Sequence, residues 1–210
     1  MKDLIIVGAG GFGRELLQWC KDINKQKPTW NIKGFIDDNL NALNGYECDY
    51  PVIGTIKEWQ PSENEEFALA VAEPHLKEKI VLLLKAKNAV FTAIIHPTAR
   101  ICNFSKIGEG LILYPYSGIN VNTKIGNFVT LLSSGIGHDC EVDDFCTISS
   151  YCDITGGVRL GKRVFVGSRS TVVPKRKIGD DVYIAAGSTV VTNIKTGIRV
   201  MGNPAVKMDF

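Results

Sequence analysis

The sequence lacks any long hydrophobic run, although 45% of its 210 residues are hydrophobic. A helix that crosses a bilayer needs about 20 consecutive apolar residues, and no segment approaches that length. The apolar start at residues 4–7 breaks at once into glycines, which indicates a buried strand instead of the apolar core of a secretion signal. We therefore expect no membrane span.

A strong charge of either sign is also missing. The chain has 24 Lys and Arg against 22 Asp and Glu, a formal net charge of +2, which gives no case for a nucleic-acid partner. Six cysteines without a secretion signal indicate a reducing compartment and not a disulfide framework. We expect a cytoplasmic protein that is long enough for two compact units.

What the sequence has in abundance is a six-residue repeat between residues 101 and 195. The second position is often glycine, where the backbone can adopt positive φ without steric cost, and one unit, residues 131–135, is a residue short. A period of six fits neither an amphipathic helix nor a hairpin strand, so it indicates a β-solenoid. The aliphatic heads of the units are Ile101, Ile107, Leu113, Ile119, Ile125, Leu131, Ile136, Val142, Ile148, Ile154, Leu160, Val166, Val172, Ile178, Ile184 and Val190.

Three units close a triangular coil, so residues eighteen apart stack at the strand spacing of roughly 4.8 Å, with heads and fifth positions inside. Cys140, Cys146 and Cys152 take fifth positions on the three walls of one coil, and their thiols are expected to point inward. Zinc needs four ligands, and no nearby histidine faces inward. We therefore favour small apolar packing for these cysteines and expect no metal.

The first part of the chain predicts a nucleotide site. Residues 2–13 indicate a strand that ends in a glycine turn, with Gly8, Gly10 and Gly13 at G-x-G-x-x-G spacing. A helical stretch at 14–23 follows, and a second strand at 32–36 ends in Asp37 and Asp38. Backbone N–H groups at such a turn face a pyrophosphate, and an acid meets ribose hydroxyls. The alternative is a strand–helix turn that needs glycine only for packing.

Further strands at 52–53, 67–72 and 90–95, with a helix at 74–87, complete an α/β half-Rossmann-like domain over residues 1–96. This domain has too few strands for a dehydrogenase. An all-β parallel β-helix domain with a short C-terminal cap is predicted for residues 97–210.

Both domains resemble those of one family. The motifs that carry the resemblance are GAGGFG at 8–13, GFIDD at 34–38, IHPTA at 95–99, GHD at 137–139 and GNPA at 202–205. Over nearly its whole length the chain resembles the NeuD/PglD-type sugar acetyltransferases, which are hexapeptide-repeat acyltransferases with an N-terminal nucleotide-binding domain. The resemblance implies a left-handed β-helix, a homotrimer, acetyl-CoA in a groove between neighbouring coils, and a nucleotide-sugar acceptor on the small domain.

The resemblance also implies roles for individual residues. His138 matches the catalytic histidine, Asp139 the carboxylate that follows it, and Gly156 a glycine whose amide faces the thioester. The other matches are Ser168 and Ala186 in the coenzyme groove, with Gly8, Gly10, Gly13, Asp37 and Asp38 at the nucleotide site.

His138 is the only histidine of the repeats. An unperturbed imidazole has a pKa of about 6.5, so at neutral pH it can take a proton from an attacking amine or hydroxyl. Asp139 would accept from the other ring nitrogen and support the developing positive charge. Nothing pairs a nucleophilic Cys or Ser with this base, so we expect direct transfer without an acyl-enzyme.

The predicted function is acetyl-CoA-dependent N-acetylation of a nucleotide-linked amino sugar for surface glycan biosynthesis. Compared with bacillosamine N-acetyltransferases, Phe12 and Thr147 replace histidines and Leu132 replaces an asparagine. These changed acceptor positions keep open an O-acetyltransferase that acts on a sugar such as sialic acid. A non-catalytic solenoid scaffold and a metal hydratase of the γ-carbonic-anhydrase type also stay open, although the hydratase needs several coil histidines.

Overall fold

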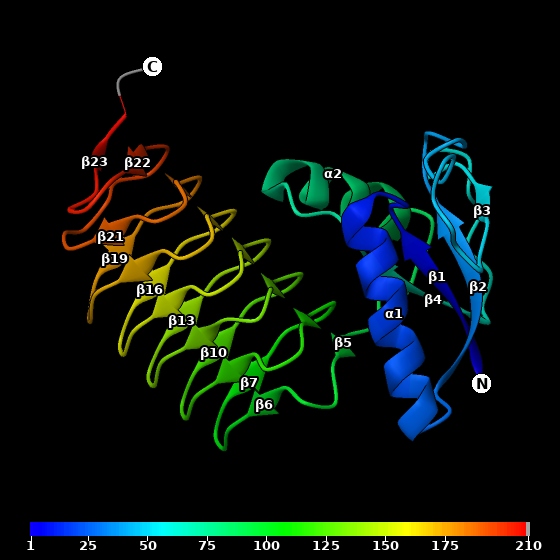
Figure 1. Ribbon diagram of the computed structural model, residues 1–210, viewed down its shortest axis with the longest axis horizontal. Coiled ribbons are helices and arrows are strands. Elements are labelled where there is room, and N and C mark those ends of the chain that lie inside the picture. Colours follow the sequence, from blue (N-terminus) through cyan, green and yellow to red (C-terminus); the bar gives the residue numbers. More distant parts are fainter. Residues whose placement is uncertain (209–210) are drawn as a thin grey trace. The chain divides into compact units, whose positions relative to one another are not determined.

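The computed structural model describes residues 1–208 and divides into two compact units, Met1–Pro97 and a second that begins at Thr98 (Figure 1). The predicted fold class is confirmed, because an α/β unit precedes a solenoid of parallel strands.

The first unit contains a four-stranded parallel sheet in the order β3-β2-β1-β4. Its strands are β1 (Lys2–Val7), β2 (Trp30–Ile36), β3 (Val52–Gly54) and β4 (Glu65–Leu69), and β5 (Ile94–Ile95) follows later in the unit. Residues 4–7 of β1 are all buried, without alternation. This pattern is typical of a central strand that is covered on both faces.

Two helices belong to this unit. Helix α1 (Gly11–Gln26) extends beyond the predicted 14–23 at both ends and buries Leu16, Leu17 and Cys20. Helix α2 (Pro74–Lys85) begins where the Glu73 carboxylate accepts hydrogen bonds from two backbone N–H groups of the first turn. Within residues 1–208, neither helix has the length and apolar character needed to span a membrane.

The second unit is a three-walled parallel β-helix built almost entirely from two-residue strands, seen from green to red in Figure 1. Wall 1 holds β6 (Arg100–Ile101), β9 (Gly118–Ile119), β12 (Gly135–Ile136), β15 (Asp153–Ile154), β18 (Thr171–Val172) and β21 (Thr189–Val190). Wall 2 holds β7 (Lys106–Ile107), β10 (Lys124–Ile125), β13 (Glu141–Val142), β16 (Arg159–Leu160) and β19 (Lys177–Ile178). Wall 3 includes β8 (Ile112–Leu113), β11 (Thr130–Leu131), β14 (Thr147–Ile148), β17 (Phe165–Val166), β20 (Tyr183–Ile184), β22 (Arg199–Met201) and its antiparallel partner β23 (Val206–Lys207).

Strands of one wall pair in register at the repeat distance. Ile154 pairs with Val172, eighteen residues later, whereas Ile119 pairs with Ile136, only seventeen residues later. The residue that the short unit lacks is therefore missing from the turn between β11 and β12, and the register of the strands is unchanged. Heads stay inside the prism on both sides of this turn because the register is kept.

The turns correct one expectation from the sequence. The second-position glycines do not adopt positive φ; they allow close approach of the next coil, since a Cβ on Gly167 would lie 2.5 Å from the Ala186 nitrogen. The left-handed conformation falls instead on the fourth position. The fourth-position residues with positive φ are Phe104, Gly110, Tyr116, Asn122, Phe128, Asp139, Phe145, Tyr151, Gly157, Arg163, Arg169, Lys175, Asp181 and Gly187.

Candidate active site

His138 occupies the turn that follows β12, at the edge of wall 1, and its side chain is 65% exposed. Its Nδ1 lies 2.7 Å from Asp139 Oδ2, and Asp139 has a φ of 59°. This left-handed residue turns the carboxylate back toward the preceding ring. When Nδ1 carries the ring proton and donates it to Asp139, the lone pair of Nε2 is left to accept a proton.

The imidazole ring lies directly against Gly156, which follows β15 one coil later. A Cβ on Gly156 would lie only 2.5 Å from His138 Nε2 and 2.6 Å from Cε1. The two turns are also joined through the backbone, because the Gly157 N–H donates to the His138 carbonyl at 2.8 Å. The structure thus brings together His138 and Asp139, the predicted catalytic residues, and Gly156, whose amide was predicted to face the thioester.

The Gly156 amide differs from the matching amides on another edge of the prism. There, the N–H of Asn127 donates to Asp144 Oδ1 at 2.7 Å, and that of Lys162 donates to Asp180 Oδ1 at 2.9 Å. In the coil after Gly156 the matching residue is Pro174, which has no side-chain oxygen. Among the described residues no acceptor is found for the Gly156 N–H, so it can donate to a ligand.

Ser168 and Ala186 lie at the opposite edge of the same wall. They occupy turns that precede β18 and β21, whereas His138 and Gly156 occupy turns that follow β12 and β15. Ser168 and Ala186 are stacked in successive coils, because the Gly187 N–H donates to the Ser168 carbonyl at 2.8 Å. Of the predicted coenzyme residues, Gly156 therefore lies against His138, whereas Ser168 and Ala186 do not, but both groups border wall 1.

Two of the three glycines in the glycine turn of the first unit, Gly8 and Gly13, are required by close backbone packing. Gly8 has a φ of 100°, and a Cβ on Gly13 would lie 2.0 Å from the Gly8 carbonyl oxygen. Gly10, in contrast, is exposed and has open space where a Cβ would be. Only Gly10 is therefore free of a packing requirement, which makes it the position that tests whether the turn meets a ligand.

The carboxylates of Asp37 and Asp38, which follow β2, accept hydrogen bonds from backbone N–H groups of the protein itself. Asp37 Oδ2 accepts from the Ala9 N–H and Oδ1 from the Asn39 N–H, both at 2.8 Å. Asp38 Oδ1 accepts from the Lys57 N–H at 3.1 Å. Asp37 is thus brought to the glycine turn as predicted, while Asp38 is directed toward the segment after β3.

Sequence reasoning missed a hollow of about 300 Å³ beside α1. Its lining includes Arg14 and Lys21, and the Arg14 guanidinium lies 3.7 Å from the centre of the Tyr46 ring. The only signal in the sequence is the run of aromatic and acidic residues at 46–50, which has no periodicity to mark it as part of a site.

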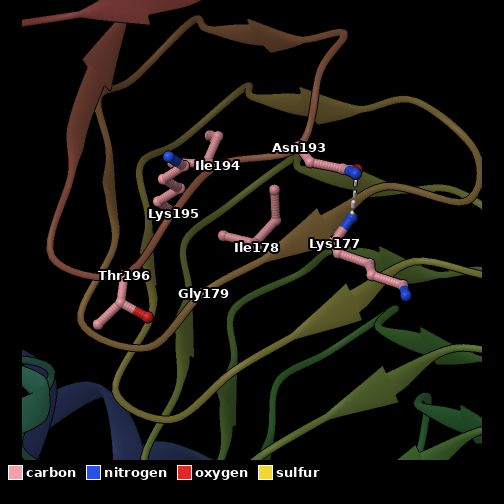
Figure 2. Close-up of a pocket in the computed structure, with 7 residues that line it drawn as sticks. All are labelled: Lys177, Ile178, Gly179, Asn193, Ile194, Lys195 and Thr196. Atoms are coloured by element: carbon pink, nitrogen blue, oxygen red, sulfur yellow. Dashed lines mark hydrogen bonds between the residues drawn. The ribbon is translucent and has the colours of Figure 1, made fainter.

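A larger hollow of about 580 Å³ lies at the last coils of the β-helix, shown in Figure 2. Ile178 and Ile194 form its apolar part, and Asn193 Oδ1 accepts from the Lys177 N–H at 2.9 Å. It contains none of the predicted site residues. Within residues 1–208 no cluster of His, Cys, Asp and Glu is placed to hold a metal ion.

Comparison with known proteins agrees with this division of the chain. Residues 3–84 match the PglD N-terminal domain family, and residues 157–192 match the bacterial transferase hexapeptide family. GDP-perosamine N-acetyltransferase of Escherichia coli O157:H7 is 29% identical to this chain, over 97% of this chain and 95% of the relative.

Solved structures of the same kind cover almost the whole chain. The acetyltransferase domain of PglB from Neisseria gonorrhoeae FA1090, in complex with acetyl coenzyme A, is 25% identical with a TM-score of 0.86 and 99% coverage of both chains. PerB from Caulobacter crescentus, in complex with CoA and GDP-perosamine, is 22% identical with a TM-score of 0.88, covering 99% of this chain and 98% of that one.

The parallel β-helix and its match to the hexapeptide family indicate an acyltransferase of the hexapeptide class. The α/β unit in front of it narrows the assignment. Over nearly its whole length the chain is similar to sugar N-acetyltransferases of the NeuD/PglD type, as the sequence motifs had indicated.

Proposed function

We propose that the protein transfers the acetyl group of acetyl-CoA to the amino group of a nucleotide-linked sugar, as a homotrimer in the synthesis of a surface glycan. The arrangement of His138, Asp139 and Gly156 carries this proposal, because it sets a proton acceptor beside a free amide donor. The ligands and activities of the relatives support the donor and the acceptor: acetyl coenzyme A with the PglB domain, and GDP-perosamine with the Escherichia coli and Caulobacter proteins.

In the proposed reaction the amine lone pair attacks the thioester carbonyl carbon and forms a C–N bond. His138 Nε2 removes a proton from the amine nitrogen, and the Asp139 carboxylate supports the charge on the ring. The Gly156 N–H donates to the carbonyl oxygen as it becomes negative. The C–S bond then breaks, and the proton passes from His138 to the departing CoA sulfur, which restores the neutral ring.

Wall 1 offers the surface for the donor. Gly156 at one edge and Ser168 and Ala186 at the other are the predicted coenzyme contacts, and we place the extended coenzyme along the strands between them. The glycine turn and Asp37 in the first unit are proposed to receive the acceptor's nucleotide, with Gly10 meeting the phosphates.

Product analysis tests the proposed function. The full chain is incubated with acetyl-CoA and GDP-, UDP- and dTDP-linked amino sugars, each paired with the sugar that has a hydroxyl in place of the amine. Mass spectrometry is expected to show one added acetyl group on an amino sugar and none on its hydroxyl counterpart. Acetylation of the hydroxyl sugars alone would establish the O-acetyltransferase instead, and no product with any sugar would contradict the proposal.

Asp139→Asn is expected to lower kcat about tenfold, because the charge-assisted hydrogen bond that orients the His138 ring becomes a neutral one. Asparagine tolerates the left-handed backbone at this position, so the turn should persist. Steady-state kinetics measure the effect, and unchanged kcat would remove Asp139 from the mechanism. Asn122, the matching residue one coil earlier, provides a control as Asn122→Asp.

Two alanine substitutions separate the roles of the glycine turn. Gly10→Ala is expected to raise KM for the nucleotide sugar about tenfold, the effect of losing one hydrogen bond to a charged group, without a change in melting temperature. Gly13→Ala should instead lower the free energy of unfolding by about 1–3 kcal/mol, because its methyl group meets the Gly8 carbonyl. Unchanged KM in Gly10→Ala would support a glycine turn that serves packing alone.

A further inference from the structure

A buried thiol lies beneath the peptide group that presents the Gly156 amide. Cys140, in the fifth position of the coil that carries His138, is buried, and its Sγ lies 3.1 Å from the Thr155 carbonyl oxygen. The same Sγ is 3.7 Å from the His138 carbonyl oxygen. One side chain therefore contacts the backbone of both turns that form the candidate active site.

The geometry of a peptide bond gives this contact a consequence. The Thr155 carbonyl and the Gly156 N–H belong to one planar trans peptide group, in which the two point in opposite directions. A thiol that holds the carbonyl toward the interior therefore aims the N–H outward, to the side of the wall where the His138 ring lies. The Thr155 hydroxyl does not hydrogen-bond to this peptide group, because it donates to the Val172 carbonyl at 2.6 Å.

The contact recurs along the edge of the β-helix that carries His138. On this edge a fifth-position hydroxyl donates to the second-position carbonyl of the next coil: Ser105 Oγ to the Asn120 oxygen at 2.8 Å and Thr123 Oγ1 to the Gly137 oxygen at 2.9 Å. These two residues and Cys140 form three successive rungs on the edge that carries His138. The next fifth position on this edge is Val158, which has no donor, so the series ends beneath the Gly156 amide.

The thiol must keep its proton to make this contact. Burial raises the pKa of the Cys140 thiol above its ordinary value, which keeps it protonated at neutral pH and able to donate. Donation to the carbonyl also polarises the peptide group, which makes its N–H a better donor.

We propose that Cys140 is a positioning residue of the acetyl transfer: its thiol fixes and polarises the Thr155–Gly156 peptide so that the Gly156 N–H meets the thioester oxygen in the transition state. This inference rests on the proposed function. Cys140 itself touches neither substrate.

Cys146 supplies a matched control within the same coil. It is also a buried fifth-position thiol, and its Sγ lies 3.0 Å from the Gly161 carbonyl oxygen. The peptide that it holds presents the Lys162 N–H, which already donates to Asp180. Its removal therefore repeats the loss of a buried thiol contact without touching the candidate active site.

The test compares Cys140→Val, Cys140→Ser and Cys146→Val in the full chain. Valine and serine both occupy buried fifth positions elsewhere in this β-helix, so each is compatible with the wall. Cys140→Val is expected to lower kcat about tenfold, less than the 100- to 1000-fold cost of losing a whole oxyanion donor, while KM for acetyl-CoA stays unchanged. Cys140→Ser should restore kcat, and Cys146→Val should leave it at the wild-type value despite a similar loss of stability.

A spectroscopic measurement reports on the peptide group without any substrate. The sequence contains two Thr–Gly pairs, Thr155–Gly156 and Thr196–Gly197, so labelling threonine carbonyls with ¹³C and glycine nitrogens with ¹⁵N gives one signal for each. In Cys140→Val the Thr155–Gly156 carbonyl signal should move upfield, whereas the Thr196–Gly197 signal stays in place. Cys140→Ser should keep both signals near their wild-type positions.

The inference is overturned by an unmoved Thr155–Gly156 signal in Cys140→Val, by unchanged kcat in that variant, or by equal damage in Cys140→Ser. Failure of the proposed function has a different signature, because the wild-type chain would then acetylate no amino sugar. In that case the carbonyl signal still decides whether Cys140 orients the peptide.

Discussion

His138→Ala lowers kcat by about 100- to 10,000-fold, the usual contribution of a general base, if the imidazole takes the proton from the amine. KM for acetyl-CoA should change little, because the ring is assigned a task in the transition state and not in ground-state binding. The Nδ1–Asp139 contact at 2.7 Å leaves Nε2 as the ring nitrogen that faces Gly156.

Val121 provides a control for this substitution. Val121 occupies the third position of its unit, as His138 does one coil later, and it is 40% exposed. Val121→Ala therefore shortens a side chain on the same edge and leaves the His138 ring unchanged. The control should keep wild-type kcat. A His138→Ala variant that retains more than about a tenth of kcat would show that the proton leaves by another route, since general-base catalysis contributes more than that.

Gly156→Ala is expected to lower kcat about 100-fold while leaving the melting temperature nearly unchanged. The added methyl group would lie 2.5 Å from His138 Nε2, and the exposed ring can move away at little cost in stability. Moving the base by about 1 Å is enough to cost about 100-fold in rate. The substitution therefore separates catalysis from folding, because Gly156 has no positive φ that alanine would strain.

Gly118→Ala is the matched control for this variant. Gly118 lies in β9 on the same wall, and a Cβ there meets nothing within 4 Å, so kinetics and melting temperature should both be preserved. If Gly156→Ala retains wild-type kcat, the ring position seen in this structure is not the one used in the reaction.

The sequence was sufficient for the walls of the β-helix but not for its turns. A six-residue period identifies heads such as Ile154 and Val172 because burial repeats with the period, and those heads pair as expected. The period says nothing of which turn residue takes positive φ, since that depends on the closeness of the next coil. For this reason the sequence pointed to positive φ at the second-position glycines, whereas in the structure they allow close approach of the next coil.

The candidate site divides in the same way. The GHD motif at 137–139 predicted Asp139 as the partner of the His138 ring, and the positive φ of Asp139, which the sequence did not predict, completes the contact. The contact of that ring with Gly156 crosses from one coil to the next and depends on the stacking of the two turns, so no local pattern contains it. The hydrogen bond from the Ala9 N–H to the Asp37 carboxylate also depends on β1 and β2, which pair only in the folded chain.

One coil of the β-helix, in which Ile119 pairs with Ile136, has seventeen residues instead of eighteen. This coil shows how the sequence of a β-helix can lose a residue without losing the fold. Each coil pairs only with its two neighbours, so the stability of a stacked array is roughly a sum of local contributions. A deletion confined to a turn leaves the neighbouring strands in register and is felt by one layer alone. Turns of this β-helix can therefore gain or lose residues while the layers above and below keep their strand pairing.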